Sequence, residues 1–181
     1  GPTQRVLVLV PATLTTATPA VLVYYHGLDG YYDGRGIEDA LLSTAGLLDA
    51  IGARSNLIAI LPEALPGDAD RRAALQRCVN RELGFEKLVD LGLATAARTL
   101  STGRLDAGPI GLVAHSGGGA MIGASLAPEG GRYGAKVSEL TLLDAGYAYR
   151  KSWEQARAWL LLRPTAKKVV RRPKRCSSRR A

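Results

Sequence analysis

The sequence has few cysteines and no long apolar run, and these shortages exclude several classes of protein. Its two cysteines, Cys78 and Cys176, are too few for a disulfide framework or a cysteine-based metal site. No stretch is long and apolar enough to cross a bilayer. We therefore expect no membrane span and no bound metal, and two unpaired thiols slightly favour the cytoplasm.

Acidic residues are missing from the C-terminal segment, which carries the whole net charge of +8. Eight basic residues gather within 167–180: Lys167, Lys168, Arg171, Arg172, Lys174, Arg175, Arg179 and Arg180. We expect one globular domain over residues 1–162 and a basic tail over 163–181. Residues 167–170 of this tail have the pattern of a short edge strand, and we expect disorder beyond Pro173.

Elsewhere the sequence alternates between predicted strands and helices. Further strands are expected at 5–10, 20–25, 57–61, 110–114 and 137–143, and helices at 37–51, 82–100, 116–126 and 152–162. The first two strands are predicted to pair antiparallel, because the link between them has no room for a helix. The alternation from residue 20 onward predicts an α/β fold, a three-layer α/β/α sandwich around a mostly parallel sheet.

The most informative stretch follows the apolar run at 110–114. His115 and Ser116 end this run, and three glycines then open a helix of small residues. This order is typical of a nucleophile elbow, in which a serine lies on a strained strand-to-helix turn with its hydroxyl exposed. Gly118 would allow a close backbone approach, and the amide of Gly117 would face developing negative charge.

A second motif, Tyr24-Tyr25-His26-Gly27-Leu28-Asp29-Gly30, ends the predicted strand at 20–25. Together with Ala114-His115-Ser116-Gly117-Gly118, it resembles the α/β-hydrolase superfamily over about residues 5–162. Alanine stands in the first glycine position of the elbow, as in some bacterial lipases. The resemblance implies serine hydrolysis of an ester-like bond in a small-molecule substrate, without a cofactor.

The resemblance also implies a role for particular residues. Ser116 would attack the carbonyl, the amides of Leu28 and Gly117 would hold the oxyanion, and Asp144 is the best available acid. Three further residues are expected to line the pocket: His26, Gly27 and His115.

Histidine is scarce, and this departs from the family. The chain has two histidines, His26 and His115, whereas the family carries a catalytic histidine after the acid. His115 should point away from Ser116 off the turn, and a histidine at the position of His26 usually shapes the oxyanion loop. The basic tail stands where the last strand and the histidine loop belong. We therefore expect a hydrolase shortened at its C-terminus, with little turnover.

Two other functions fit parts of the sequence. The basic tail would suit an arm that binds nucleic acid or an anionic surface on an inactive hydrolase scaffold. Strand, glycines, helix, strand and then Asp144 is also the order of a Rossmann-like nucleotide-binding domain. The glycine fingerprint for that domain is incomplete, since Ala120 or Ile122 stands where a glycine is required. Neither the substrate nor the oligomeric state follows from the sequence.

Overall fold

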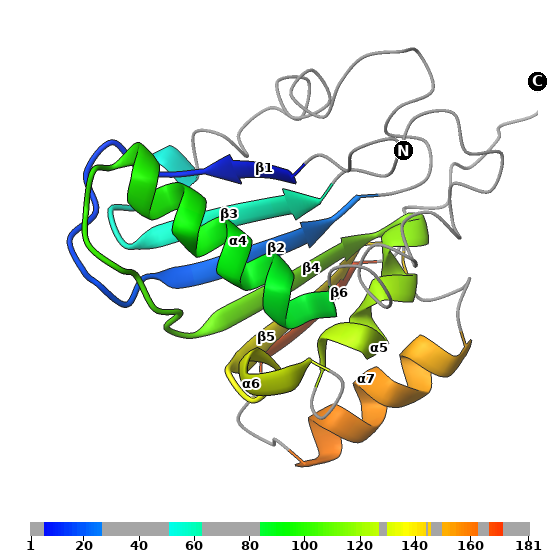
Figure 1. Ribbon diagram of the computed structural model, residues 1–181. Coiled ribbons are helices and arrows are strands. Elements are labelled where there is room, and N and C mark those ends of the chain that lie inside the picture. The colour runs from blue at the N-terminus through cyan, green and yellow to red at the C-terminus, as the bar shows by residue number, and fades with distance from the viewer. Residues whose placement is uncertain are drawn as a thin grey trace, which may run out of the picture.

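The computed structural model of the protein describes residues 6–26, 51–62, 84–126, 130–143, 145, 150–162 and 167–171. Six strands form one sheet in the order β1-β3-β2-β4-β5-β6, with helices packed against it (Figure 1). The strands are β1 Val6–Leu9, β2 Ala20–Tyr25, β3 Leu57–Pro62, β4 Ile110–His115, β5 Val137–Leu143 and β6 Lys167–Arg171. The helices are α4 Gly84–Thr99, η3 Ser116–Met121, α5 Ile122–Ser125, α6 Gly131–Gly134 and α7 Arg150–Leu162.

The sheet is parallel except for its first strand. β2 pairs with both β3 and β4, β4 pairs with β5, and β5 pairs with β6, all in parallel. The predicted antiparallel pairing of β1 with β2 is wrong, because β1 pairs antiparallel with β3 instead. The link between β1 and β2 passes the beginning of β3, where the amide of Thr15 donates to the carbonyl of Ser55 at 3.0 Å. The link therefore crosses a neighbouring strand rather than forming a hairpin.

Most element boundaries agree with the sequence pattern. β2 and β5 begin and end at the predicted residues, and α4 and α7 differ from their predictions by one or two residues. The predicted helix at 116–126 divides into the 3-10 helix η3 and the short α5, since its glycines are poor α-helix formers. Of the helix predicted at 37–51, only its end lies among the described residues, where Ile51 and Gly52 are helical.

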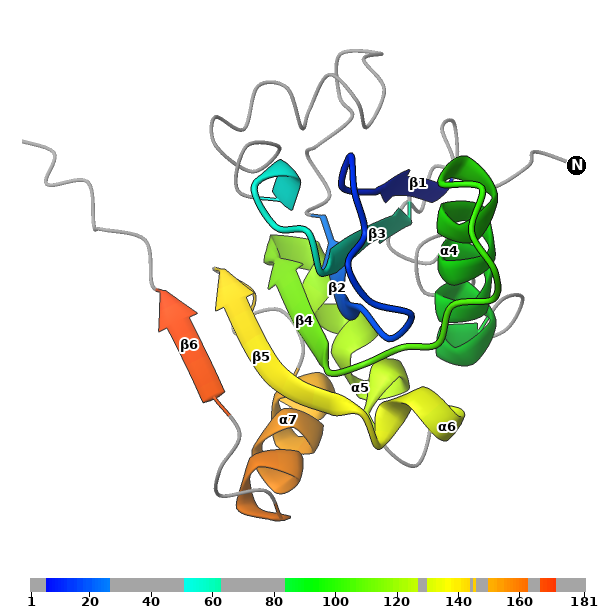
Figure 2. The ribbon, with the colours of Figure 1, turned by 90° about the vertical axis from the view of Figure 1, so that its left-hand side faces the viewer.

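The two faces of the sheet are covered by different parts of the chain. Val21, Val23 and Tyr25 of β2 belong to the main core, on the side that carries α4, α5 and α7 (Figure 2). Leu22 and Tyr24 face the other way and pack with the smaller cluster around Ile51. The alternation along β2 thus separates two apolar layers, and the molecule is a three-layer α/β/α sandwich around a mostly parallel sheet.

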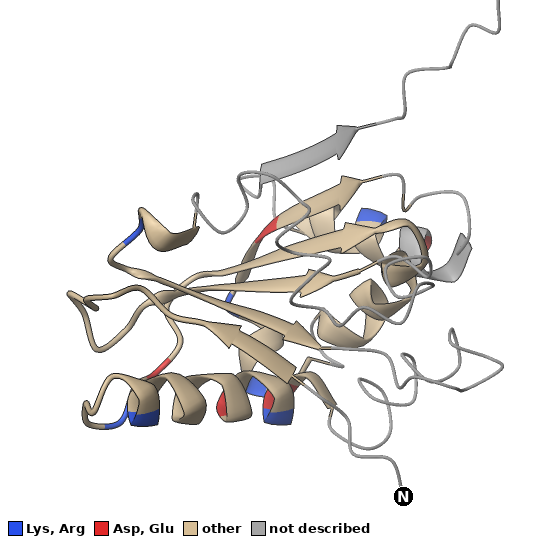
Figure 3. Ribbon diagram, turned by 90° about the horizontal axis from the view of Figure 1, so that it is seen from above, with Lys and Arg blue, Asp and Glu red and all other residues tan. Residues whose placement is uncertain are grey.

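α4 carries charged residues of both signs (Figure 3). On this helix Asp90 accepts hydrogen bonds from Arg132 and from the hydroxyl of Tyr133, the latter at 2.7 Å. The Nε of Arg132 also lies 3.5 Å from Glu86. Burial, with Asp90 as a hydrogen-bond partner, raises the pKa of Tyr133 to about 12. This cluster of Glu86, Asp90, Arg132 and Tyr133, the α4–α6 cluster, joins α6 to α4.

Within the described ranges, no helix has both the length and the apolarity needed to cross a membrane. The same residues contain no group of three or more histidine, cysteine or carboxylate side chains that could hold a metal ion.

Candidate active site

The middle of the sheet holds the residues that the sequence singles out. β2 and β4 are neighbours, and Tyr25 at the end of β2 pairs with Ala114. His26 therefore follows β2 at the same edge of the sheet where His115 ends β4 and Ser116 follows it. The two strand ends bring together motifs that are about 90 residues apart in the sequence.

This pair of strands is also where the chain changes direction across the sheet. After β2 the chain continues to β3 on one side, whereas β4 and β5 lie on the other. The segment between β2 and β3 ends in the cluster around Ile51 on one face, while η3 and α5 follow β4 on the opposite face. In open parallel sheets, ligands bind at the carboxyl ends of strands at such a switch point. The strand order thus indicates a ligand site at the ends of β2 and β4.

Ser116 has an unusual backbone conformation at this edge. It follows β4 directly, begins η3 and has a φ of +47°. His115 before it is still extended, with φ −111° and ψ 132°. A left-handed conformation is unfavourable for a residue with a side chain and persists only where the surroundings enforce it. The strained strand-to-helix turn predicted at Ser116 is confirmed.

Two glycines explain how the turn fits between neighbouring strands. A Cβ on Gly118 would overlap the carbonyl oxygen of Tyr25 and lie 2.7 Å from that of His26. A Cβ on Gly119 would lie 2.6 Å from the carbonyl oxygen of Ala145, just beyond β5. The backbone of η3 therefore packs directly against the ends of β2 and β5, which only glycine permits.

The other predicted site residues are only partly among those that the structure describes. His26 is buried, with 6% of its surface exposed, and its backbone contacts the turn through Gly118. Gly117 is buried at the beginning of η3. Gly27, Leu28 and Asp144 lie outside the described residues, so their predicted roles are not tested.

His115 lies on the other side of β4 from the helix that follows. Ile110, Leu112 and Ala114 belong to the main core, so the alternation along β4 places His115 on the opposite face, where it is exposed. Tyr24 is also an unsuitable base, because burial raises the pKa of its hydroxyl and keeps it protonated at neutral pH. Neither side chain is a natural proton acceptor for Ser116.

Sequence reasoning missed one polar pair beside the turn. The hydroxyl of Tyr25 lies 2.6 Å from that of Ser125 at the end of α5, and both side chains are fully buried. The two residues are 100 positions apart, and no local pattern marks a serine in a small-residue helix as a partner for a distant tyrosine. Only the pairing of β2 with β4 brings them together.

Neither a family model nor a curated protein matches this sequence. Among solved structures, the chain is similar to a crystal structure of esterase B from Lactobacillus rhamnosis inhibited by a tributyrin phosphonate, with a TM-score of 0.46 and 14% identity. The alignment covers 86% of this chain and 48% of the esterase, so the chain spans about half the length of that enzyme. A similarity this weak carries no argument about the site.

Proposed function

We propose that the protein is a serine hydrolase of the α/β-hydrolase type, with Ser116 as its nucleophile toward an ester-like bond. The observation that supports this best is the left-handed backbone of Ser116 at the end of β4, beside the switch point of the sheet. A nucleophile elbow requires this turn, because it lifts the hydroxyl out of the sheet edge toward a substrate.

In this proposal the Ser116 oxygen attacks the carbonyl carbon of the ester. The carbonyl oxygen becomes negatively charged, and the amides of Gly117 and Leu28 would stabilise it by hydrogen bonding. Collapse of this intermediate expels the alcohol, which takes up a proton, and leaves an acyl group on Ser116. Water then releases the acid. Asp144 is the proposed acidic residue of the catalytic triad.

The slow step is the removal of the Ser116 proton. In serine hydrolases a histidine takes it, and the exposed His115 lies on the opposite face of β4 from η3. Because no histidine follows Asp144 in the sequence, we expect ester hydrolysis of only about 10³ over the uncatalysed rate, the residual level of serine proteases that have lost a triad member.

The test is covalent labelling with a small, activated fluorophosphonate, followed by peptide mass spectrometry. We expect an adduct on Ser116 that is absent from the Ser116→Ala variant. Ser101 provides an internal reference, because it is an exposed serine with nearly the same φ, +50°. Equal labelling of Ser101 and Ser116 would contradict a nucleophilic role for Ser116.

Hydrolysis of an activated ester supplies a second measurement. The slow turnover should disappear in Ser116→Ala. Turnover near ~10 s⁻¹, a typical enzyme value, would show instead that a base is present in this chain. A His26→Asn variant would then decide whether His26 supplies it.

A further inference from the structure

A directed chain of hydrogen bonds runs from β2 into the helices after Ser116. The Ser125 hydroxyl donates to the carbonyl of Met121 at 3.0 Å, and it lies 2.6 Å from the hydroxyl of Tyr25. A serine hydroxyl has one proton, which here goes to Met121. Tyr25 must therefore donate to Ser125, which orders the chain as tyrosine, serine and backbone carbonyl.

These three residues stand at the ends of the elements that hold the turn. Tyr25 is the last residue of β2, Met121 ends the 3-10 helix that begins at Ser116, and Ser125 ends α5. Tyr25 also pairs with Ala114, two residues before Ser116. The hydrogen bonds thus connect the strand beside the turn with the far end of the helix that leaves it.

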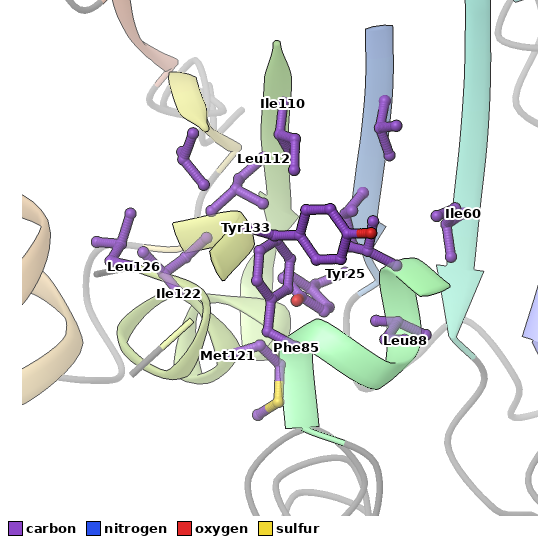
Figure 4. Packing of buried hydrophobic residues seen from close by; sticks show 14 of the residues in the cluster. Tyr25, Ile60, Phe85, Leu88, Ile110, Leu112, Met121, Ile122, Leu126 and Tyr133 are labelled. Carbon is purple, nitrogen blue, oxygen red and sulfur yellow. The ribbon is translucent and has the colours of Figure 1, made fainter. Parts of the chain in front are cut away.

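The surroundings of this pair are apolar. Tyr25 lies in the main core near Phe85, Met121 and Ile122 (Figure 4), and neither Tyr25 nor Ser125 is exposed. Phenylalanine and alanine would fill nearly the same space without burying two hydroxyl groups. Packing alone therefore does not account for the hydroxyls, whereas a directional link between β2 and α5 does.

The end of β2 also contacts the Ser116 turn at Gly118. The carbonyl oxygens of Tyr25 and His26 lie so close to Gly118 that no side chain fits there. η3 is thus held to β2 by backbone contact near its beginning and by the hydroxyl chain at its end. Two attachments along one short helix restrict its rotation, and with it the direction in which Ser116 points.

We propose that Tyr25 and Ser125 are positioning residues that keep the Ser116 turn in its left-handed conformation. The proposal rests on the nucleophilic role of Ser116 proposed above. Neither hydroxyl contacts the substrate; each acts through the backbone of η3. The pair, which we call the Tyr25–Ser125 clasp, works as a unit, because either hydroxyl without the other leaves a buried polar group with one partner fewer.

The test uses Tyr25→Phe, Ser125→Ala and the double variant. We expect each single variant to lower the maximal rate of fluorophosphonate labelling at Ser116 by about tenfold, the effect of one buried hydrogen bond, with the half-saturating probe concentration unchanged. The double variant should be no slower than the single ones, because removing one hydroxyl already breaks the chain.

Tyr133→Phe is the matched control. Tyr133 is also a buried tyrosine in the main core, and its hydroxyl donates to Asp90 in the α4–α6 cluster. This variant should lose thermal stability while Ser116 is labelled at the normal rate. If Tyr25→Phe changed only the melting temperature, as this control does, the clasp would be a structural contact and the proposal wrong.

Amide hydrogen exchange tests the clasp without any reaction. In Tyr25→Phe and Ser125→Ala, the amides of Gly117, Gly118 and Gly119 should exchange faster, while those of α4 stay protected. Faster exchange together with an unlabelled wild-type Ser116 would support the clasp and refute the proposed hydrolase. Normal labelling and unchanged exchange in both variants would refute the positioning role of the clasp and leave the proposed hydrolase standing. If Tyr25→Phe does not fold, Ser125→Ala alone provides the test.

Discussion

Ser101 and Ser116 have nearly the same left-handed backbone, with φ values of +50° and +47°, but for different reasons. Ser101 follows α4, where the amide of Thr102 donates to Ala97 at 3.0 Å and that of Ser101 donates to Arg98 at 3.2 Å. These two bonds form a Schellman motif, which ends a helix with a left-handed residue at the position of Ser101. Helix termination therefore accounts for Ser101 entirely.

Ser116 stands at the beginning of a helix, where no such ending is needed. Its turn lies against the ends of β2 and β5, and Gly118 and Gly119 allow this approach. At Ser101 the conformation follows from hydrogen bonds to residues at most five positions away; at Ser116 it depends on contacts with distant strands. Strain that tertiary packing enforces, without a local reason, is the kind found at functional sites.

The largest effect should come from adding a side chain at Gly118, where the Ser116 turn packs against the end of β2. In Gly118→Ala the new methyl group meets the backbone carbonyls of Tyr25 and His26, which cannot move without displacing β2. We expect a loss of about 3 kcal/mol in the free energy of unfolding, measured by urea denaturation.

Gly123→Ala is the control for this variant. Its methyl group would meet the amide end of the Gln155 side chain on α7, which can rotate away. The expected loss is below about 1 kcal/mol. Equal losses in the two variants would mean that the turn is no more tightly packed than the rest of the helix.

The two serines themselves provide an intermediate effect. Glycine accepts a left-handed conformation freely, so Ser101→Gly and Ser116→Gly should each stabilise the fold by about 0.5–1 kcal/mol, after allowing for the greater chain entropy of glycine. Thermal unfolding measures this gain. Only Ser116→Gly should also abolish fluorophosphonate labelling, and destabilisation by Ser116→Gly would show that its side chain holds the turn.

The last effect appears only at alkaline pH and concerns the α4–α6 cluster. A pKa of about 12 for Tyr133, above its ordinary value near 10, means that folding favours the protonated phenol. The resulting stability is complete below about pH 10 and is lost as the pH rises toward 12. Tyr133→Phe should therefore show a shallower loss of stability over this range than the wild type, and parallel curves would contradict the assignment.

Local patterns account for the elements and for the candidate nucleophile. The apolar alternation in β2 and the amphipathic spacing in α4 depend on neighbouring residues, so both elements were predicted nearly to the residue. The turn at Ser116 was also predictable, because a serine followed by three glycines after an apolar strand is typical of a sharp strand-to-helix turn. The roles of Leu28 and Asp144 stay predictions, since neither lies among the described residues.

By itself, the sequence determined which of the described residues form strands, which faces they bury and where the strained turn at Ser116 lies, because these depend on side chains a few positions apart. Tertiary structure alone decided that β1 pairs with β3, that the carbonyls of Tyr25 and His26 lie beneath Gly118, and that Tyr25 reaches Ser125. An apolar pattern specifies the buried face of a strand but not its neighbour at either edge. Those neighbours are selected only when the whole sheet assembles, and the surroundings of Ser116 depend on that selection.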